Sequence, residues 1–527
     1  MRSAERTRTA FAGDPPAQAE RGVVSAQHPM AAVVGAEILA DGGNVVDAAV
    51  ATAFASAVAD IGRTGIGGYG GHLVYHEAAS GQTWLVDFPS YAPRAAHERM
   101  FTDSSSGMTG VQAVGVPAVV AGLAAAHTRF GSLAWAQVLA PAIHLAEEGI
   151  QSAPSGREPV LAERRRAAAF PETIRVFMDA WDGDRLRQPD LARSLRRLAD
   201  DPRDLYAGQL ADRIVDYLKG EGGLLDHADL AQYQPWVGPA TSSRYRDYEL
   251  HTPGAGSGAG VLIPLLGALN HFDLASLEPL GAERIGLLAA MAGRIWRDRL
   301  AHAGYVGDRN AGEDLLQPGY WSTVAEDVRQ ARAQRAVSSA DQGCTNHFSV
   351  ADVEGNVVAC TTTLQRLLGS AVTVPGTGIL LNNAMGLFDP RPGHPNSVAP
   401  ARRAMTNMCP TVVVRDQQAV LSSGASGGRL IPSMLAQAFT LVIDHGFSMD
   451  RALRAPRLHH AGDGNLAIEE GLSDAALDDL AAQGYRLGVR PANGTDLGGQ
   501  APAIWFDNER HLFGAPDPRR HGAAAAV

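Results

Sequence analysis

Lysine is almost absent from this chain of 527 residues, with Lys219 as its one representative. Schiff-base chemistry needs a lysine amine, and the neighbours of Lys219 predict an exposed helix end rather than a reaction centre. Cysteine is also scarce, because the sequence holds only Cys344, Cys360 and Cys409. These spacings match neither a metal-binding pattern nor a disulfide framework, so we expect a reducing, cytoplasmic compartment.

Long hydrophobic runs and an excess of positive charge are missing as well. The most apolar windows, 261–269 and 430–443, are short or interrupted, whereas a membrane-spanning helix needs roughly 20 apolar residues. Residues 1–22 are polar, lack the apolar core of a signal peptide and are expected to form a flexible arm. Acidic residues outnumber basic ones by 56 to 45, which disfavours nucleic acid and membranes as partners.

Helical patterns dominate the first part of the chain and strand patterns begin after residue 344. The segment Asp-Gly-Gly-Asn at 41–44 predicts a turn between two helices, and a glycine run at 65–71 precedes strands. We therefore expect an α+β layered core rather than alternating βαβ units. Helices are expected at 29–40, 45–59, within 117–150 and 182–218, and at 283–302 and 429–445. Strands are expected at 72–76, 83–88, 248–253, 347–351, 357–364, 411–414 and 419–423, with an exposed loop at 338–343.

Two threonines occupy the same end of the hairpin at 347–364. If its turn centres between Glu354 and Gly355, Thr345 falls opposite Leu364, one residue from Thr363. A threonine hydroxyl is a weak nucleophile, but a cut directly before Thr345 would place a free α-amine beside it as a base. The usual pKa of an α-amine, about 7.7 to 8.0, suits that task. Since β-branched threonine is also common in strands, the pattern permits a nucleophile without requiring one.

A second candidate site is the segment Gly-Ala-Ser-Gly-Gly at 424–428, between a strand and a helix. A phosphate-binding loop requires Lys-Ser or Lys-Thr after its last glycine, whereas Arg429 and Leu430 follow here, so we reject nucleotide binding. Backbone N–H groups at the start of a helix also form oxyanion holes, which acyl transfer needs. A tight strand-to-helix turn has the same composition, so both interpretations stay open.

Other polar features are interpreted as structural. His459 and His460 are neighbours that point in opposite directions in an extended chain, and no third metal ligand is evident. We expect these two residues, and His347, to make hydrogen bonds within the fold. The charged run Glu163 to Arg166 predicts a solvated helix face rather than an anion site.

A series of segments, in order along the chain, carries a more specific signal. In the first part they are GIGGYGG at 65–71, VDF at 86–88, AP at 92–93, GSLAW at 131–135 and LAPAI at 139–143. In the second part they are TNHFSV at 345–350, GILLNN at 378–383, GG at 427–428, APRLHH at 455–460 and DPR at 517–519. Together they resemble the γ-glutamyltranspeptidase family of N-terminal-nucleophile hydrolases over nearly the whole chain.

The resemblance implies an αββα sandwich, made as a precursor that cuts itself between Cys344 and Thr345. It implies a large fragment, 23–344, and a small fragment, 345–527, which stay together as a heterodimer and one folded unit. Thr345 would attack the amide of a small or peptide-like substrate, Thr363 would hydrogen-bond it, and Gly427 and Gly428 would form the oxyanion hole. The resemblance implies no metal and no organic cofactor.

The sequence departs from the family where the substrate amino acid is held. The family arginine for the α-carboxylate aligns with Pro89, and the family aspartate for the α-amine aligns with Leu387. Paired serines that assist carboxylate binding become Thr406 and Asn407. Hydrogen bonds to charged groups contribute about 1.5 to 3 kcal/mol each, so losing both clamps should weaken γ-glutamyl selection by about two to four orders of magnitude. Gln365 replaces a family asparagine and can still orient an acyl group.

Three functions follow from these retained and replaced residues. The first is an amidohydrolase or acyltransferase whose acyl group is not standard γ-glutamyl; the segment 388–404 is also shorter than in lidded members, which would admit a bulkier substrate. The second is a γ-glutamyl hydrolase or transferase acting on glutathione-like amides, with Arg94 or Arg403 holding the carboxylate. The third is a non-catalytic relative that serves as a scaffold or binding protein.

Overall fold

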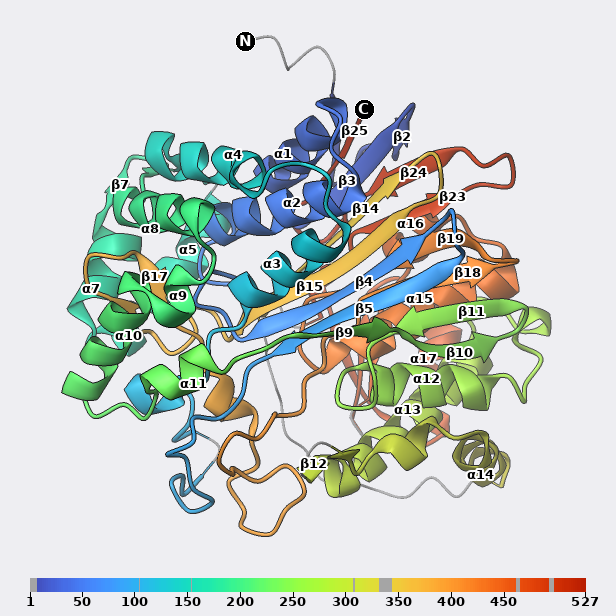
Figure 1. Cartoon of the computed structure of the whole chain (residues 1–527). Helices are drawn as coiled ribbons and strands as arrows, with labels where there is room; N and C mark the ends of the chain where they lie inside the picture. Colours follow the sequence, from blue (N-terminus) through green and yellow to red (C-terminus); the bar gives the residue numbers. More distant parts are fainter. Residues whose placement is uncertain are drawn as a thin grey trace.

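Two antiparallel sheets lie face to face between layers of helices (Figure 1). The computed structural model describes residues 7–103, 105–152, 154–306, 309–330, 344–460, 465–491 and 497–527. The α+β class and the αββα sandwich predicted from the sequence are confirmed. The loop expected at 338–343 lies outside the described residues.

The first sheet has eight strands and carries the start of the small fragment at its centre. Its order is β1 (Arg8–Phe11), β25 (Ala523–Ala526), β3 (Gly22–Ala26), β14 (Cys344–Asp352), β15 (Val357–Gln365), β4 (Gly70–Glu77), β5 (Gln82–Pro89) and β9 (Trp236–Pro239). The second sheet has seven strands. Its order is β10 (Thr241–Tyr245), β11 (Tyr248–Thr252), β18 (Thr411–Arg415), β19 (Gln418–Ser423), β23 (Ala503–Phe506), β24 (Leu512–Ala515) and β2 (Ala17–Ala19).

The outer layers contain the long helices, and the first two have the bounds that the sequence predicts. Asn44 caps the second helix: its side chain accepts hydrogen bonds from the backbone N–H groups of Val46 and Asp47. The longer helices are α1 (Pro29–Ala40), α2 (Val45–Ala59), α3 (Val119–Phe130), α4 (Trp135–Glu148), α5 (Pro154–Ala162), α8 (Pro189–Asp200), α10 (Gln209–Gly220), α12 (Ala259–Leu269), α13 (Ala282–His302), α14 (Pro318–Arg329), α15 (Leu430–His445) and α17 (Asp474–Ala482). The shorter ones are α6 (Arg164–Ala167), α7 (Pro171–Ile174), α9 (Asp204–Ala207), α11 (His227–Ala231) and α16 (Met449–Arg454).

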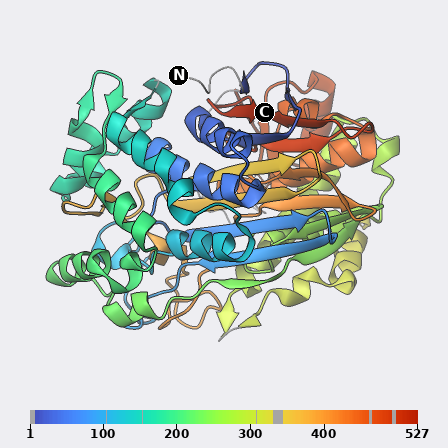
Figure 2. The ribbon, with the colours of Figure 1, turned by 45° about the horizontal axis from the view of Figure 1, so that its top comes forward.

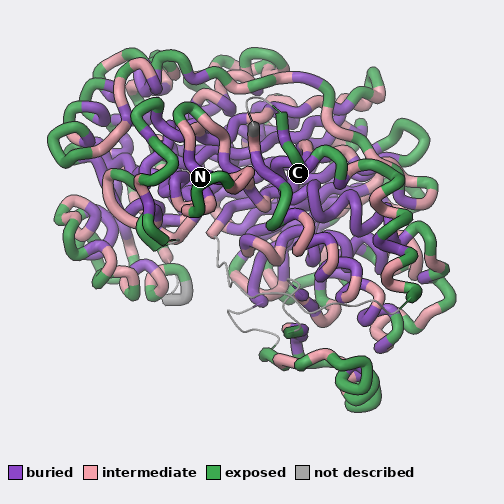
Figure 3. The backbone as a smooth tube through the Cα atoms, turned by 90° about the horizontal axis from the view of Figure 1, so that it is seen from below, coloured by how far each residue is buried: buried purple, intermediate pink, exposed green. Residues whose placement is uncertain are grey.

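Three apolar clusters join these four layers. Helices α1 to α3 pack on the outer face of the first sheet, with α4 packed against α2, and α12, α13 and α15 pack behind the second sheet (Figure 2). Between the sheets lies a cluster of small residues, mostly alanine and valine, which lets the sheets approach closely. Buried residues fill this interior, and exposed ones are concentrated on the outer turns (Figure 3).

The expectation of a flexible arm at 1–22 is wrong for residues 7–22. Strand β1 pairs with β25, with Arg8 opposite Ala526, and β2 pairs with β24, with Ala17 opposite Gly514. Both strands therefore belong to the sheets. Local patterns do not reveal this, because the partner strands come from the far end of the chain. Within the described residues, no helix is long and apolar enough to cross a membrane.

Candidate active site

The candidate nucleophile lies at a bulge in the central hairpin of the first sheet. Cys344 pairs with Gln365 and Asn346 pairs with Thr362, so Thr345 faces two residues, Thr363 and Leu364. The predicted register therefore holds at the Cys344 pair but is shifted by one residue along the rest of the hairpin. Bulges re-aim side chains and are frequent beside active sites. Here the bulge leaves the two threonine hydroxyls side by side.

The hydroxyl of Thr363 connects both sides of the Cys344–Thr345 peptide bond. Thr345 Oγ1 donates to Thr363 Oγ1 at 3.3 Å, and Thr363 Oγ1 in turn donates to the carbonyl oxygen of Cys344. The backbone N–H of Gln365 donates to Thr363 Oγ1 at 2.8 Å and fixes its position. Thr345 and Thr363 are only 5% and 3% exposed, so these contacts are shielded from water. The bonds orient the lone pairs of Thr345 Oγ1 and polarise the carbonyl before it.

The structure brings most of the predicted site residues into one pocket. The pocket measures about 310 Å³, including the part open to solvent. Its lining residues are Thr345, Thr363, Gln365, Leu387, Thr406, Asn407, Met408, Gly428 and Ile431. Pro89, a predicted substrate-binding position, and Gly427, a predicted oxyanion residue, are not among them.

The glycine loop connects β19 to α15 and passes the pocket at Gly428. Gly427 and Gly428 have φ angles of +124° and +58°, which a side chain would strain. The loop is held by Ser426, whose backbone N–H donates to Gln500 O at 2.8 Å and whose hydroxyl accepts from Gln500 N at 3.1 Å. A rigid turn with helical N–H groups at its end suits an oxyanion hole; the assignment of Gly427 and Gly428 to that role stays a prediction.

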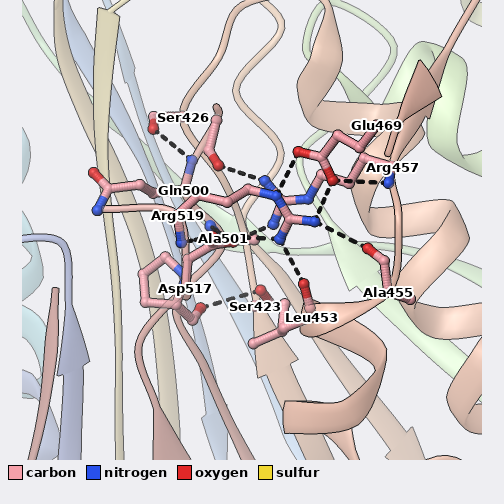
Figure 4. A network of polar contacts seen from close by, with 12 residues as sticks. Ser423, Ser426, Leu453, Ala455, Arg457, Glu469, Gln500, Ala501, Asp517 and Arg519 are labelled. Carbon is pink, nitrogen blue, oxygen red and sulfur yellow. Dashed lines mark hydrogen bonds and ion pairs between the residues drawn. The ribbon is translucent and has the colours of Figure 1, made fainter. Parts of the chain in front are cut away.

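Behind this loop lies a buried network of two arginines and two carboxylates that the sequence did not predict (Figure 4). Arg457 pairs with Asp517, Arg519 pairs with Glu469, and all four side chains are at most 6% exposed. Asp517 also accepts from Ala501 N at 2.9 Å, and Arg457 donates to Gly499 O. Since Gly499 and Gln500 touch the glycine loop, the network fixes the segment before β23 that supports the loop.

Removing one member of this network is expected to destabilise the protein. An Arg457→Met variant leaves Asp517 with fewer partners, and breaking a buried pair typically costs about 3–5 kcal/mol. Thermal or denaturant unfolding measures the loss. The matched control is Arg8→Met, because the Arg8–Glu20 pair is 78% exposed on both sides and should contribute less than about 1 kcal/mol. Equal stability of the two variants would contradict a supporting role for the network.

The histidines behave as the structural interpretation predicts. His347 is fully buried, with Nδ1 at 2.8 Å from Thr361 Oγ1 and Nε2 at 3.2 Å from Ser349 Oγ. Burial lowers the pKa of His347 to about 3, so it is neutral. Nδ1 of His459 contacts Ser433 Oγ at 3.2 Å, and Nδ1 of His460 contacts a backbone carbonyl at 2.9 Å. His347 thereby joins β14 to Thr361 on β15, and its neighbour on β14, Ser349, contacts the second sheet through Ser422.

The charged run at 163–166 is not simply a solvated helix face. The Arg166 side chain is 14% exposed and pairs with Glu163. It donates to Gly369 O at 2.9 Å and to Leu367 O, in the turn that follows β15. This arginine therefore holds the chain just beyond the β14–β15 hairpin, a contact across about two hundred residues that helical patterning does not reveal.

The two positions predicted to replace the charged clamps, Pro89 and Leu387, are both apolar, and only Leu387 reaches the pocket. Leu387 lines the pocket, whereas Pro89 is buried at the end of β5 and accepts from Tyr233 Oη at 3.0 Å through its carbonyl. Arg403 pairs with Asp87 at 3.0 Å and donates to Tyr91 Oη. Burial alone would lower the pKa of Arg403, but the Asp87 carboxylate and Tyr91 raise it overall, so the guanidinium group is charged and already paired.

The other candidate cation lies outside the pocket, and so does the shortened segment. Arg94 is exposed and pairs with Gln232 rather than with the pocket lining. Leu387 and Thr406, on either side of 388–405, line the pocket, and none of the pocket-lining residues that the structure describes falls between them. Asn396 Nδ2 holds that segment by donating to Leu387 O at 2.8 Å, and His394 contacts Leu300 O at 3.0 Å.

Two layered sheets between helices, with Thr345 on a central strand, are the architecture of the N-terminal-nucleophile hydrolases. The chain belongs to the gamma-glutamyltranspeptidase family, whose model matches residues 31–527. It is 33% identical to the Acylase ACY 1 proenzyme of Pseudomonas sp. (strain SE83), over 97% of this chain and 94% of the relative. It is 31% identical to the Glutathione hydrolase proenzyme of Bacillus subtilis (strain 168), over 96% and 91%.

A solved structure shares the fold across its full length. The cephalosporin acylase from Bacillus halodurans superposes with a TM-score of 0.88 at 25% identity, covering 97% of both chains. These likenesses show that the chain is an amidohydrolase or acyltransferase of this family. The non-catalytic alternative is therefore set aside.

The contact between the two threonine hydroxyls gives a direct prediction. A Thr363→Val variant loses the donor to the Cys344 carbonyl and leaves the N–H of Gln365 without its acceptor. We expect slower self-cleavage and a kcat lower by about 10- to 100-fold, from a loss of about 1–3 kcal/mol. Cleavage half-time and steady-state kinetics measure both effects. Thr363→Ser keeps the hydroxyl and should retain most of the rate; an equal loss in both variants would point to packing instead.

Proposed function

We propose that this protein is an N-terminal-threonine amidohydrolase or acyltransferase that matures by cutting itself before Thr345. The observation that carries the proposal is the alignment of Thr345 Oγ1, Thr363 Oγ1 and the Cys344 carbonyl at the wall of a pocket that Gly428 also lines. Relatives named as proenzymes support a processed form. The products would be a large fragment ending at residue 344 and a small fragment, 345–527, associated as a heterodimer.

In the precursor, Thr345 Oγ1 attacks the carbonyl carbon of Cys344 and the C–N bond breaks. The hydroxyl proton passes to the departing nitrogen, which leaves an ester on Thr345 and a free α-amine. Water then hydrolyses the ester, which restores the hydroxyl and releases Cys344 as a carboxylate. Thr363 assists by donating to the oxygen on which charge develops.

In the mature enzyme, the α-amine takes the proton of Thr345 Oγ1 as that oxygen attacks the substrate amide. The N–H groups of Gly427 and Gly428 stabilise the oxyanion of the tetrahedral intermediate. The C–N bond then breaks, the leaving amine takes the proton, and the acyl group stays on Thr345 as an ester. Water or an acceptor amine attacks that ester and frees the enzyme.

The pocket favours an acyl group other than γ-glutamyl. Leu387 offers an apolar surface where an ammonium group would need a carboxylate, and an unpaired buried charge is costly. Thr406, Asn407 and the side-chain amide of Gln365 supply the polar contacts that orient the acyl group. Relatives named as acylases are consistent with this choice.

A γ-glutamyl hydrolase or transferase is the second candidate, because a Glutathione hydrolase proenzyme matches over most of its length. Such an enzyme would need another residue to bind the α-carboxylate of the substrate. Arg403 has a guanidinium group near β5, but Asp87 and Tyr91 already bind it.

Mass spectrometry tests the proposal. The purified protein is incubated with a panel of acyl anilides, including a γ-glutamyl one, and the fragments are weighed. We expect two fragments, with Thr345 as the new N-terminus and a transient acyl adduct on the smaller one. A chain that stays intact while folded would contradict the proposal.

We further propose a cytoplasmic location, which fractionation of cells would test.

A further inference from the structure

Two buried amide oxygens on residues close to Thr345 have no hydrogen-bond partner among the residues that the structure describes. They are Oδ1 of Asn346 and Oε1 of Gln365. Asn346 is 0% exposed and Gln365 is 7% exposed, so bulk water does not compensate them. An unpaired buried acceptor costs about 1–3 kcal/mol, and native folds leave few of them. Asn346 directly follows Thr345, and Gln365 lines the same pocket as Thr345, so a donor for both oxygens is expected at this residue.

The amide of Asn346 is held in one orientation by Asp60, which ends α2. Asn346 Nδ2 donates to Asp60 Oδ2 at 2.9 Å, and an ionised carboxylate can only accept, so Oδ1 is the free end of the amide. Asp60 also pairs with Arg63 at 3.1 Å, and Arg63 Nη1 reaches Cys344 Sγ at 3.9 Å. The residues before and after Thr345 are thus tied to the same point of the fold.

Gln365 approaches the same peptide bond from the neighbouring strand. Its Cα is the ladder partner of Cys344, and its N–H is bound by Thr363 Oγ1 at 2.8 Å. Its backbone has a φ angle of +84°, which glutamine rarely adopts, and its side chain lines the pocket beside Thr345. Gln365 therefore combines a strained backbone conformation with the second unpaired oxygen.

Cleavage before Thr345 gives the nitrogen of that residue enough N–H groups to serve both unpaired oxygens. The peptide nitrogen of Thr345 has one N–H, a neutral α-amine has two, and the ammonium formed during catalysis has three. We propose, on the basis of the function proposed above, that Asn346 Oδ1 and Gln365 Oε1 accept hydrogen bonds from the α-amine of Thr345 and hold it as the base. Asp60 is then a positioning residue, because it acts through Asn346.

The charges around this nitrogen make such acceptors useful. The surrounding ionisable groups are Asp60 and Arg63 after α2, Arg166 with Glu163, Arg366 after β15, Arg520 with Asp517, and Cys344 and His347 on β14 itself. Four of these nine groups are guanidinium groups, against three carboxyl groups, and a guanidinium group opposes protonation of a nearby amine. Two amide oxygens that accept its N–H groups favour protonation, so the amine can take the proton of Thr345 Oγ1.

The test is the pH dependence of kcat/KM, whose acidic limb reports the pKa of the base in the free enzyme. Gln365→Glu places a carboxylate beside the amine and should move this limb to higher pH by about one unit. Gln365→Met and Asn346→Leu remove an acceptor and should move it to lower pH, and Asp60→Asn should follow Asn346→Leu more weakly. Gln418→Glu, an exposed change of the same charge on β19, should leave the limb in place.

A second measurement does not depend on turnover. Reductive methylation of the Thr345 α-amine, followed by mass at several pH values, gives its pKa in each cleaved variant, and the shifts should have the same signs. If wild type never splits, the proposed function fails. If all variants split and their acidic limbs coincide with wild type, this inference alone is overturned. A Gln365 variant with a changed KM but an unchanged acidic limb would show that Gln365 binds only the acyl group. Folded variants that never split would show that these residues act only in the precursor. Either result overturns the inference.

Discussion

A Thr345→Ala variant is expected to remain one chain of 55.4 kDa and to lose amide turnover. The wild-type protein should instead divide after residue 344 of 527, in a mass ratio of roughly two to one. Removing the hydroxyl removes the proposed nucleophile of both reactions, and losing a nucleophile typically lowers kcat on the order of 10⁴-fold or more. Intact-mass measurement and hydrolysis of a chromogenic amide record the two effects separately.

Two further variants separate chemistry from folding. Thr345→Ser keeps a hydroxyl and should still split, at a reduced rate. Thr323→Ala removes an exposed threonine on α14 and should behave as wild type. Full turnover by Thr345→Ala, or splitting of that variant at the same bond, would show that another group carries the reaction.

Local patterns in the sequence predicted the elements well where the determining contacts are close in the chain. The bounds of α1 and α2 follow from the Asp-Gly-Gly-Asn turn and the cap at Asn44, all within a few residues. The strand register of the hairpin was off by one residue along most of its length. A bulge opposite Thr345 absorbs the difference, and alternation of side chains alone does not reveal such an insertion.

Contacts between distant segments escaped local reasoning. Residues 8–11 lack a strong strand pattern of their own, and only pairing with Ala523–Ala526 makes them a strand. Arg457 and Arg519 belong to segments whose resemblance to the family was visible, yet their role became clear only from the ion pairs across the fold. Asn346 gave no signal, because its neighbour Asp60 lies far away in sequence.

The candidate site was predictable because Thr345, Thr363 and the glycine pair lie in short threonine and glycine motifs, and because the resemblance to the family marks the substrate-binding positions. Seven of the nine predicted catalytic and substrate-binding positions line one pocket: Thr345, Thr363, Gln365, Leu387, Thr406, Asn407 and Gly428. The identity of the substrate is harder to predict from the sequence, because it depends on which charged side chains remain unpaired after folding. Arg403 illustrates the difference, because its partner Asp87 is known only from the structure.

Replacing Leu387 with aspartate should redirect the pocket towards γ-glutamyl amides. The new carboxylate would face the pocket where an α-ammonium group has no partner, and one charge-assisted hydrogen bond contributes about 1.5–3 kcal/mol. We therefore expect kcat/KM for a γ-glutamyl anilide to rise by about 10- to 100-fold. For the matching anilide without the α-amine it should fall, because the carboxylate is then desolvated without compensation. The ratio of the two values is the measurement.

Leu387→Asn separates charge from polarity, since its side chain has nearly the shape of aspartate but no charge. It should weaken binding of apolar acyl groups without producing the gain for γ-glutamyl substrates. If both variants changed the ratio equally, the selection would depend on the size of residue 387 rather than on its charge. If neither changed it, the α-amine would bind elsewhere, and the acyl group would have to enter the pocket in a different orientation from the one that Thr406 and Asn407 suggest.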